Sequence, residues 1–212
     1  MSIVLRSVFI LLLVPLFAFA YTGVIAKPEK ANVVLPIMDP EVPQEFFGRL
    51  EGFPHTFQFQ VTEELPFKAH IFVPDRANQK NDISIILVKG ERRGVSEIGR
   101  TKIKEQTWES SYDSLLAESF RTGGQLEATL VPGSYVFEVS SPNNEGKYRL
   151  VLGTEKIKRS YFENISVLFE VKSFLGSSSF SVIRSPLIYW PLLLLAWIGG
   201  SIWYKKRKKK IT

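Results

Sequence analysis

Hydrophobic and polar residues alternate along the middle of the chain. In HTFQFQV, Phe57, Phe59 and Val61 are separated by single polar residues, so one face of the segment is apolar and the other is polar. The same period of two recurs in FKAHIFVPD, DISIILVKG, QLEATLV, YVFEVSS and KYRLVLG. A period of two is typical of a half-buried β-strand. The pattern therefore predicts six or seven short strands that each bury one face.

The segments between these strands contain residues that favour turns. VPGS at 131–134 and SPNNEG at 141–146 combine proline, which presets φ, with glycine, which readily adopts positive φ. Short strands joined by such turns predict an all-β fold, an antiparallel β-sandwich.

Two stretches do not follow the strand pattern. WESSYDSLLAESF places Trp108, Tyr112 and Phe120 near helical spacing, which predicts a short helix or an ordered loop. These three aromatic side chains are candidates for an exposed platform that binds a glycan or a peptide. The interpretation we favour is that they cover the open edge of the sandwich. SYFENISVLFEVKSFLG is either a strand or a short amphipathic helix, and SSSFS after it is typical of a flexible stalk.

The N-terminal segment has the layout of a secretory signal peptide. Arg6 precedes an apolar block that runs to Ala20, and Ala18 and Ala20 form the small-x-small pattern that a signal peptidase cleaves, here before Tyr21. Residues 7–26 are also free of charge over 20 residues, which is long enough for an uncleaved membrane anchor. We favour cleavage, and the anchor stays open as the alternative.

The C-terminal segment is predicted to span a membrane. Residues 185–204 carry no charge and have tyrosine and tryptophan near both ends, and a helix of this length covers a hydrocarbon core of about 30 Å. Six cations follow at once: Lys205, Lys206, Arg207, Lys208, Lys209 and Lys210. Cations are costly inside the bilayer and favoured at the cytoplasmic leaflet, so this block is predicted to be a stop-transfer signal. The expected location is the cell membrane, as a single-pass type I protein with an extracytoplasmic N-terminal domain and a cytoplasmic C-terminus.

The net charge of +6 does not indicate nucleic-acid binding. Seven of the 27 basic residues lie in the two end segments, which contain no acid, so the middle of the chain holds 20 basic and 21 acidic residues. Duplex binding requires a basic face on the folded domain, and none is predicted. The chain has no cysteine, which excludes disulfides and thiolate metal sites and, in an exported domain, favours a prokaryotic host.

The sequence does not contain a recognisable catalytic motif. His55 follows Pro54 at the start of a strand, and His70 lies on the polar face of another strand. Neither histidine sits in a nucleophile or metal-ligand motif, so both are predicted to be surface residues. We expect no catalytic residue, no metal and no cofactor. The expected partners are the lipid bilayer and an extracellular protein or glycan.

LVPGSYVFEVSSPNNEGKYRLVLG resembles the closing hairpin of the bacterial pre-peptidase C-terminal domain, which has a Pro-Gly-x-Tyr strand, a loop and a Gly-x-Tyr-x-Leu strand. The resemblance covers residues 130–153 and implies a non-catalytic β-sandwich of the jelly-roll or immunoglobulin-like kind. Members of that family are appended to secreted enzymes and surface proteins. This chain departs from that setting because no peptidase domain precedes the stretch, and it lacks the acid-rich loops that would support calcium binding.

The predicted organisation is a series of segments along the chain. These are a signal peptide (1–20), a proline-rich leader (21–44) with an edge strand near residues 33–37, the sandwich (45–155), a juxtamembrane segment and stalk (156–184), one transmembrane α-helix (185–204) and a basic tail (205–212). This organisation favours a membrane-anchored, outward-facing domain of the cell envelope that binds or scaffolds.

Two other functions stay open. One is a cargo receptor of the early secretory pathway similar to the GOLD-domain proteins, in which Lys209 and Lys210 would form a dilysine retrieval signal. Against it, the chain lacks the cysteine pair common in that family. The other is a subunit of an envelope complex that contacts its partner helix through Gly199 and Gly200.

Overall fold

Strands are the most frequent secondary structure among the described residues, and the helices follow them in the chain. We describe the protein from a computed structural model, which describes residues 23–28, 30–31, 33–103, 107–153 and 161–208. The strands are β1 Gly23–Ala26, β2 Val34–Pro36, β3 Gln44–Glu51, β4 His55–Val61, β5 Leu65–Pro74, β6 Ser84–Glu91, β7 Gly94–Arg100, β8 Glu109–Asp113, β9 Glu118–Leu130, β10 Gly133–Ser140 and β11 Glu145–Leu152. The helices are α2 Tyr161–Leu175, the 3-10 helix η3 Ser179–Arg184 and α3 Pro186–Lys208.

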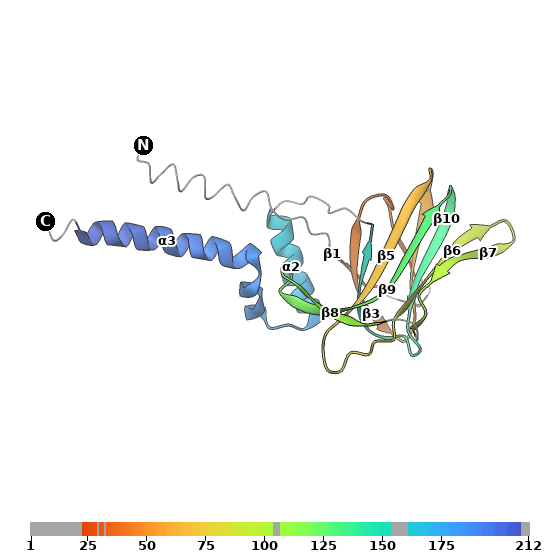
Figure 1. Cartoon of the computed structure of the whole chain (residues 1–212), viewed down its shortest axis with the longest axis horizontal. Coiled ribbons are helices and arrows are strands. Elements are labelled where there is room, and N and C mark those ends of the chain that lie inside the picture. The colour runs from red at the N-terminus through yellow and green to blue at the C-terminus, as the bar shows by residue number, and fades with distance from the viewer. Residues whose placement is uncertain (1–22, 29, 32, 104–106, 154–160, 209–212) are drawn as a thin grey trace. The chain divides into compact units, whose positions relative to one another are not determined.

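The strands form two sheets of mixed direction (Figure 1). The six-stranded sheet has the order β1-β3-β11-β5-β9-β8, and the five-stranded sheet has the order β2-β4-β10-β6-β7. Most neighbours pair antiparallel, whereas β1 pairs with β3 and β2 pairs with β4 in parallel. The predicted β-sandwich is confirmed, and the two parallel pairs at its edges are an addition to it.

The proline-rich segment before residue 45 contributes one edge strand to each sheet. β2 confirms the strand expected near residues 33–37, and Pro36 is tolerated there because an edge strand leaves one row of backbone groups unpaired. β1 comes from the same segment and was not expected. This segment is therefore part of the sandwich and not only a leader.

Aromatic side chains from both sheets fill the space between them. Phe59 of β4 stacks on Tyr135 of β10, with 5.6 Å between ring centroids, and on Phe67 of β5 in the other sheet, at 5.4 Å. All three are buried, as their alternation in the sequence predicts. Each buried side chain of this size contributes about 1.5–3 kcal/mol, so the core does not need a disulfide.

The Pro-Gly-x-Tyr stretch forms the end of the turn between β9 and β10 and the start of β10. The Tyr135 ring is buried, and its hydroxyl donates a hydrogen bond to the carbonyl of Val131, at 2.7 Å. Pro132 follows that carbonyl, so the tyrosine supplies a donor at a point where the chain leaves the sheet. The motif therefore fastens a turn to the core.

His55 lies in the core, paired with a tyrosine. It occupies the same strand phase as Phe57 and Phe59, is almost completely buried, and its Nδ1 lies 2.7 Å from the Tyr148 hydroxyl. Burial lowers the pKa of His55 to about 4, against smaller opposing effects of Glu51 and a backbone hydrogen bond to Arg49. Burial likewise raises the pKa of Tyr148. The prediction that His55 is a surface residue is therefore wrong, because its place in the alternation outweighs its polarity.

His70 has the position that the alternation predicts. It lies half-buried on the outer face of β5, out of phase with Ala69 and Ile71, which face the core. Burial and the nearby charge of Lys68 lower its pKa.

Two segments differ from their predicted structure, a third was missed, and an open alternative is decided. WESSYDSLLAESF forms β8, a turn and the start of β9, with Tyr112 paired to Ser119, and not a helix. The predicted stalk is replaced in part by η3. SYFENISVLFEVKSFLG contains α2, which confirms the helix of its two predicted alternatives. β3 was missed because Phe46 and Phe47 are both buried, so the segment is covered on both faces and shows no alternation.

The described residues divide into two compact units. The sandwich unit holds β1 to β11. The helical unit holds α2, η3 and α3 together with Ser114–Ala117, the turn between β8 and β9. The turn between β8 and β9 therefore belongs to the helical unit, although the two strands that it joins belong to the sandwich unit.

We predict that Gly48→Ala destabilises the sandwich by about 1–3 kcal/mol, as overpacked core substitutions do. The Tyr148 ring lies where the new Cβ would be placed, so ring or strand would have to move. Gly90→Ala is the matched control, because its nearest neighbour would be the Ser134 carbonyl at 3.6 Å, an ordinary contact. Urea unfolding of the full chain in detergent measures both variants. Equal losses would contradict the close approach of Tyr148 to β3.

We predict that acid destabilises the fold through His55. As the pH falls below 6.5, the unfolded chain binds a proton that the native ring, with its pKa of about 4, does not bind. Stability therefore declines between these two pH values, by roughly 2–3 kcal/mol. Unfolding free energies at about pH 7 and about pH 4.5 should differ less in His55→Gln than in the parent or in the control His70→Gln, because the pKa of His70 is lowered less than that of His55. An unchanged pH dependence in His55→Gln would assign the acid sensitivity to other groups.

Candidate functional site

The helix α3 has the length and composition of a membrane span. Its residues Pro186–Tyr204 form an apolar stretch of 19 residues, of which only 6% is buried inside the protein. The exposed apolar side chains include Leu192, Leu193, Leu195, Trp197 and Ile202. A core helix would bury such side chains against the protein, and this helix does not. The predicted C-terminal helix that could span a membrane is therefore present.

Aromatic and basic residues lie at the two ends of this helix. The Tyr189 and Trp190 rings contact each other at the start, and the Arg207 guanidinium lies 5.2 Å from the Trp203 ring centroid at the end. The cation block begins inside the last turns of α3, with Lys205, Lys206, Arg207 and Lys208. The side chains of Lys205 and Lys208, the residues Lys209 and Lys210, and the predicted cleavage positions Ala18 and Ala20 lie outside what the structure describes.

Ser185 caps the start of α3 and holds the β8–β9 turn. Its hydroxyl accepts from the backbone N–H of Leu187, at 3.3 Å, and donates to the carbonyl of Leu115, at 2.6 Å. Its own carbonyl accepts the first helical hydrogen bonds from Ile188 and Tyr189. Serine followed by proline is a recognised start of a helix, so this cap was readable from Ser185-Pro186. Its contact with a turn 70 residues away was not.

Tyr161 of α2 completes the hydrogen bonding of α3. Proline has no N–H, so Pro191 cannot donate to the carbonyl of Leu187, four residues earlier. The Tyr161 hydroxyl donates to that carbonyl, at 2.5 Å. Desolvation raises the pKa of Tyr161, so the hydroxyl keeps its proton over a wide pH range. α2 is thus bonded to the first turns of α3 at a place where a backbone donor is missing.

A buried lysine holds the other side of the turn. Lys172 of α2 is 1% exposed, and its Nζ donates to the carbonyl of Ala117, at 2.9 Å. Ala117 has a φ of 49°, a left-handed conformation that a non-glycine residue adopts only where its surroundings enforce it. Burying an ammonium group costs free energy unless the group is hydrogen-bonded. Because the Ala117 carbonyl is an acceptor for Lys172, this hydrogen bond requires the turn to keep its conformation.

In the sandwich unit, Arg149 holds the end of β8 from which the turn starts. Its Nη2 lies 2.8 Å from an Asp113 carboxylate oxygen, and its Nε bonds to Glu45 of β3. Its guanidinium carbon lies 4.9 Å from the Phe120 ring centroid and 5.2 Å from that of Phe72. Half-buried cation–π contacts and ion pairs of this kind each contribute about 1 kcal/mol.

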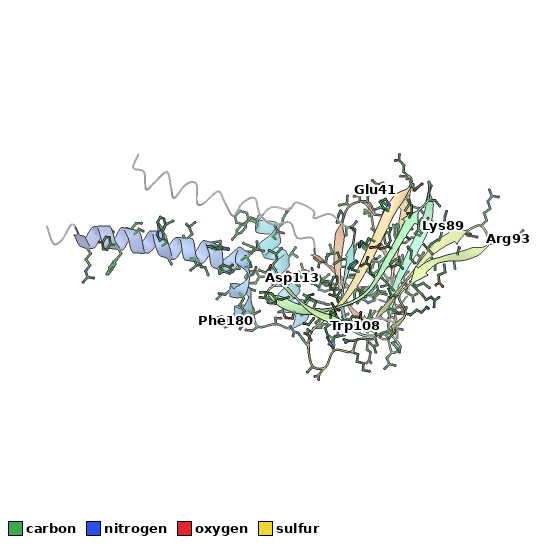
Figure 2. All side chains as sticks on the ribbon, in the orientation of Figure 1. Glu41, Lys89, Arg93, Trp108, Asp113 and Phe180 are labelled. Atoms are coloured by element: carbon green, nitrogen blue, oxygen red, sulfur yellow. The ribbon has the colours of Figure 1, made fainter. Side chains whose placement is uncertain are left out.

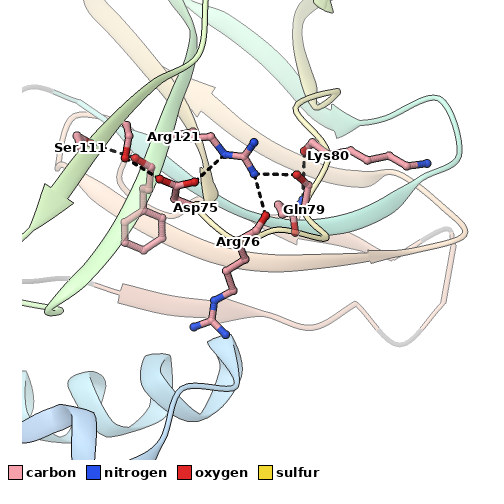
Figure 3. A network of polar contacts seen from close by, with 8 residues as sticks. Asp75, Arg76, Gln79, Lys80, Ser111 and Arg121 are labelled. Carbon is pink, nitrogen blue, oxygen red and sulfur yellow. Dashed lines mark hydrogen bonds and ion pairs between the residues drawn. The ribbon is translucent and has the colours of Figure 1, made fainter.

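A second ionic network orders the connection between β5 and β6 (Figure 3). Arg121 of β9 donates to the carbonyls of Gln79, at 2.7 Å, and Arg76, at 3.2 Å, and its Nε lies 3.3 Å from Asp75. Ser110 of β8 donates to the same Asp75 carboxylate, at 2.7 Å. The Asp75 carboxylate therefore holds the connection between β5 and β6 to β8 and β9.

The structure does not bring the three platform candidates together on one exposed surface. Tyr112 is 60% exposed, whereas Phe120 is 1% exposed and lies against Arg149. Trp108 is half-buried and packs on the sandwich core; Figure 2 shows its position. Phe120 is therefore not part of an exposed platform. Residues two apart on a strand share a face, so Phe120 lies with Thr122, the partner of Phe72, on the outer face of the sheet, where Phe47 and Arg149 cover it.

Comparisons with known proteins find similar solved structures. No protein-family model and no curated protein matches the chain. The chain is similar to the pre-peptidase C-terminal domain of collagenase from Bacillus anthracis, with 14% identity, a TM-score of 0.36, and coverage of 60% of this chain and 99% of that one. It is also similar to the Yersinia pseudotuberculosis-derived mitogen, with 12% identity, a TM-score of 0.37, and coverage of 56% and 91%.

A third similar structure is PliG of Salmonella Typhimurium, a periplasmic lysozyme inhibitor of g-type lysozyme, with 15% identity, a TM-score of 0.30, and coverage of 65% and 99%. A pre-peptidase C-terminal domain, the type of domain that residues 130–153 resemble, is thus among the similar solved structures.

We predict that Tyr161 and Pro191 are energetically coupled. Tyr161→Phe should lower the stability of the helical unit by about 1–2 kcal/mol, because the Leu187 carbonyl loses its donor. In a Pro191→Ala background, residue 191 donates to that carbonyl itself, so Tyr161→Phe should cost about 1 kcal/mol less. Thermal unfolding of the four full-chain proteins in detergent, followed by circular dichroism, measures the coupling. Equal costs in both backgrounds would contradict the role given to Tyr161.

Proposed function

We propose that this chain is a membrane-anchored protein of the cell envelope whose β-sandwich faces outward and binds or scaffolds a partner, without catalysing a reaction. The observation that carries this proposal is the long apolar and exposed surface of α3. Its 19-residue apolar stretch is about 28 Å long, close to the thickness of the hydrocarbon core, and its side chains are exposed. Lipid is the environment that would cover them.

The cation block supports the orientation. Lys206, Arg207 and Lys208 end α3, and the sequence continues with Lys209 and Lys210. Basic residues directly after a span favour the cytoplasmic side, whereas the region before the span has no such excess. The sandwich precedes the span in the chain and would therefore be exported.

The sandwich offers the β6–β7 hairpin as a contact surface. β7 is an edge strand, and its Val95 is exposed although it is apolar. Arg92 and Arg93 form the tip, and Figure 2 shows Arg93 at the far end of the hairpin. Ile98 is the extra residue of a bulge, because Leu87 pairs with Gly99 while Val88 pairs with Glu97. A bulge disfavours unspecific edge pairing, so this hairpin suits a side-chain contact with a defined partner.

The positions of the polar residues support a binding role over a catalytic one. His55 is enclosed in the core with Tyr148, so a substrate would not reach it. Among the acids, Glu45, Asp75 and Asp113 are engaged by arginines that hold strands and loops. These groups are used for structure.

We predict the topology from single cysteines, which are clean probes because the chain has none of its own. In intact cells, Glu91→Cys should react with a membrane-impermeant maleimide, whereas Thr212→Cys should react only after the membrane is permeabilised. Labelling is read on a gel. The reverse pattern would overturn the orientation, and recovery of the protein in a carbonate wash without detergent would overturn the anchor.

The binding role is tested by crosslinking in the same cells. A photo-reactive residue at Val95 should give one discrete crosslinked product, since this position lies on the proposed contact surface. Val131 is the matched control, because it is also an exposed valine but lies between β9 and β10. Equal products at both positions, or none at Val95, would contradict the hairpin as the contact surface.

A further inference from the structure

The outer face of α2 is aromatic where a water-exposed helix is usually polar. Asn164, Leu168, Val171 and Leu175 form the buried stripe of this helix. Phe162, Ser166, Phe169 and Ser173 repeat the same spacing on the exposed side, with Phe162 79% exposed and Phe169 46% exposed. Two of these four exposed residues are phenylalanine, and exposed phenylalanines opposite a buried stripe favour a second apolar environment.

η3 extends this aromatic surface toward the membrane helix. Phe180 is 83% exposed and Ile183 is also exposed, whereas Val182 between them is buried. Figure 2 shows Phe180 on the helical unit. Ile183 is three residues before Pro186, the first residue of α3, so its backbone lies within about 10 Å of the start of the span. This distance keeps the residue close to the headgroup layer, which adds several ångströms to each side of the hydrocarbon core.

α2 is also held near the start of α3. Tyr161, its first residue, bonds to the carbonyl of Leu187, the second residue of α3. Within the helical unit, Figure 1 shows α2 lying crosswise to α3 near the start of the span. A helix that crosses a membrane span at its end runs along the membrane surface.

We propose that Phe162, Phe169, Phe180 and Ile183, here called the aromatic face, lie in the interface of the lipid bilayer, with α2 along the membrane surface. This inference rests on the proposed function, because it requires α3 to span a membrane. The occupant is a neutral phospholipid interface. Glu163 and Glu170 are exposed on α2 and Arg184 is exposed at the end of η3, so the exposed charges are of both signs and the attraction to the membrane is apolar.

The test measures the depth of single labelled cysteines in the full chain, reconstituted in phosphatidylcholine vesicles. Phe169→Cys and Phe180→Cys carry an environment-sensitive fluorophore, and both positions are exposed, so the fold should tolerate it. Leu193→Cys in the middle of the span and Tyr112→Cys on β8 are the controls. Quenching is compared among lipids with a nitroxide near the headgroup, lipids with a nitroxide near the chain end, and iodide on both sides of the membrane.

The aromatic face should be quenched several-fold more by the shallow nitroxide than by the deep one, and several-fold less by iodide than Tyr112→Cys. Anionic lipid added to the vesicles should not strengthen the shallow quenching. Iodide quenching of positions 169 and 180 equal to that at 112, with lipid quenching kept at 193, would overturn this inference and leave the span intact. Protection of 169 and 180 from every quencher would mean that protein covers the face, which also overturns it. Loss of lipid quenching at 193 would overturn the proposed function itself.

Discussion

A polar group that leaves water must find a hydrogen-bond partner, and this requirement governs the helical unit. Near the membrane it is stricter, because lipid offers neither donors nor acceptors. Pro191 leaves one carbonyl without its helical donor, and the Tyr161 hydroxyl fills that place. The Ser185 hydroxyl caps α3 by accepting a hydrogen bond, and it donates its one proton to a carbonyl of the turn between β8 and β9. The residues that begin the span are therefore the same ones that bind α2 and the turn.

This arrangement gives the chain more than one connection between its parts. A simple stalk would join a sandwich to a span through one flexible segment. Here the turn Ser114–Ala117, which is covalently part of the β8–β9 hairpin, belongs to the helical unit and is held there by Ser185 and the buried Lys172. On the sandwich side, Arg149 holds Asp113, the residue directly before this turn. Side chains distant in the sequence therefore hold the turn in the helical unit and the strand end before it in the sandwich unit.

The exposure of the aromatic face is also explained by what surrounds its side chains. Val171 and Leu175 are covered by protein, whereas Phe162 and Phe180 are not, although they are just as apolar. The cost of exposing them to water disappears if the neighbouring phase is lipid. Under the proposed function, the lipid interface is then one of the surfaces against which the helical unit packs.

The sequence by itself determined the sandwich, the apolar span and the basic block after it, because these depend on local patterns. Phe57, Phe59 and Val61 alternate whatever they pack against, and the hydrophobicity of residues 185–204 needs no partner to be read. His55 was also readable, since it shares the phase of Phe57, and was missed because polarity was weighed above phase. Only the tertiary structure decided the rest. Phe120 is buried on the outer face of β9 because Arg149 covers it, and Tyr161 meets Leu187, both through contacts between distant residues that no local pattern records.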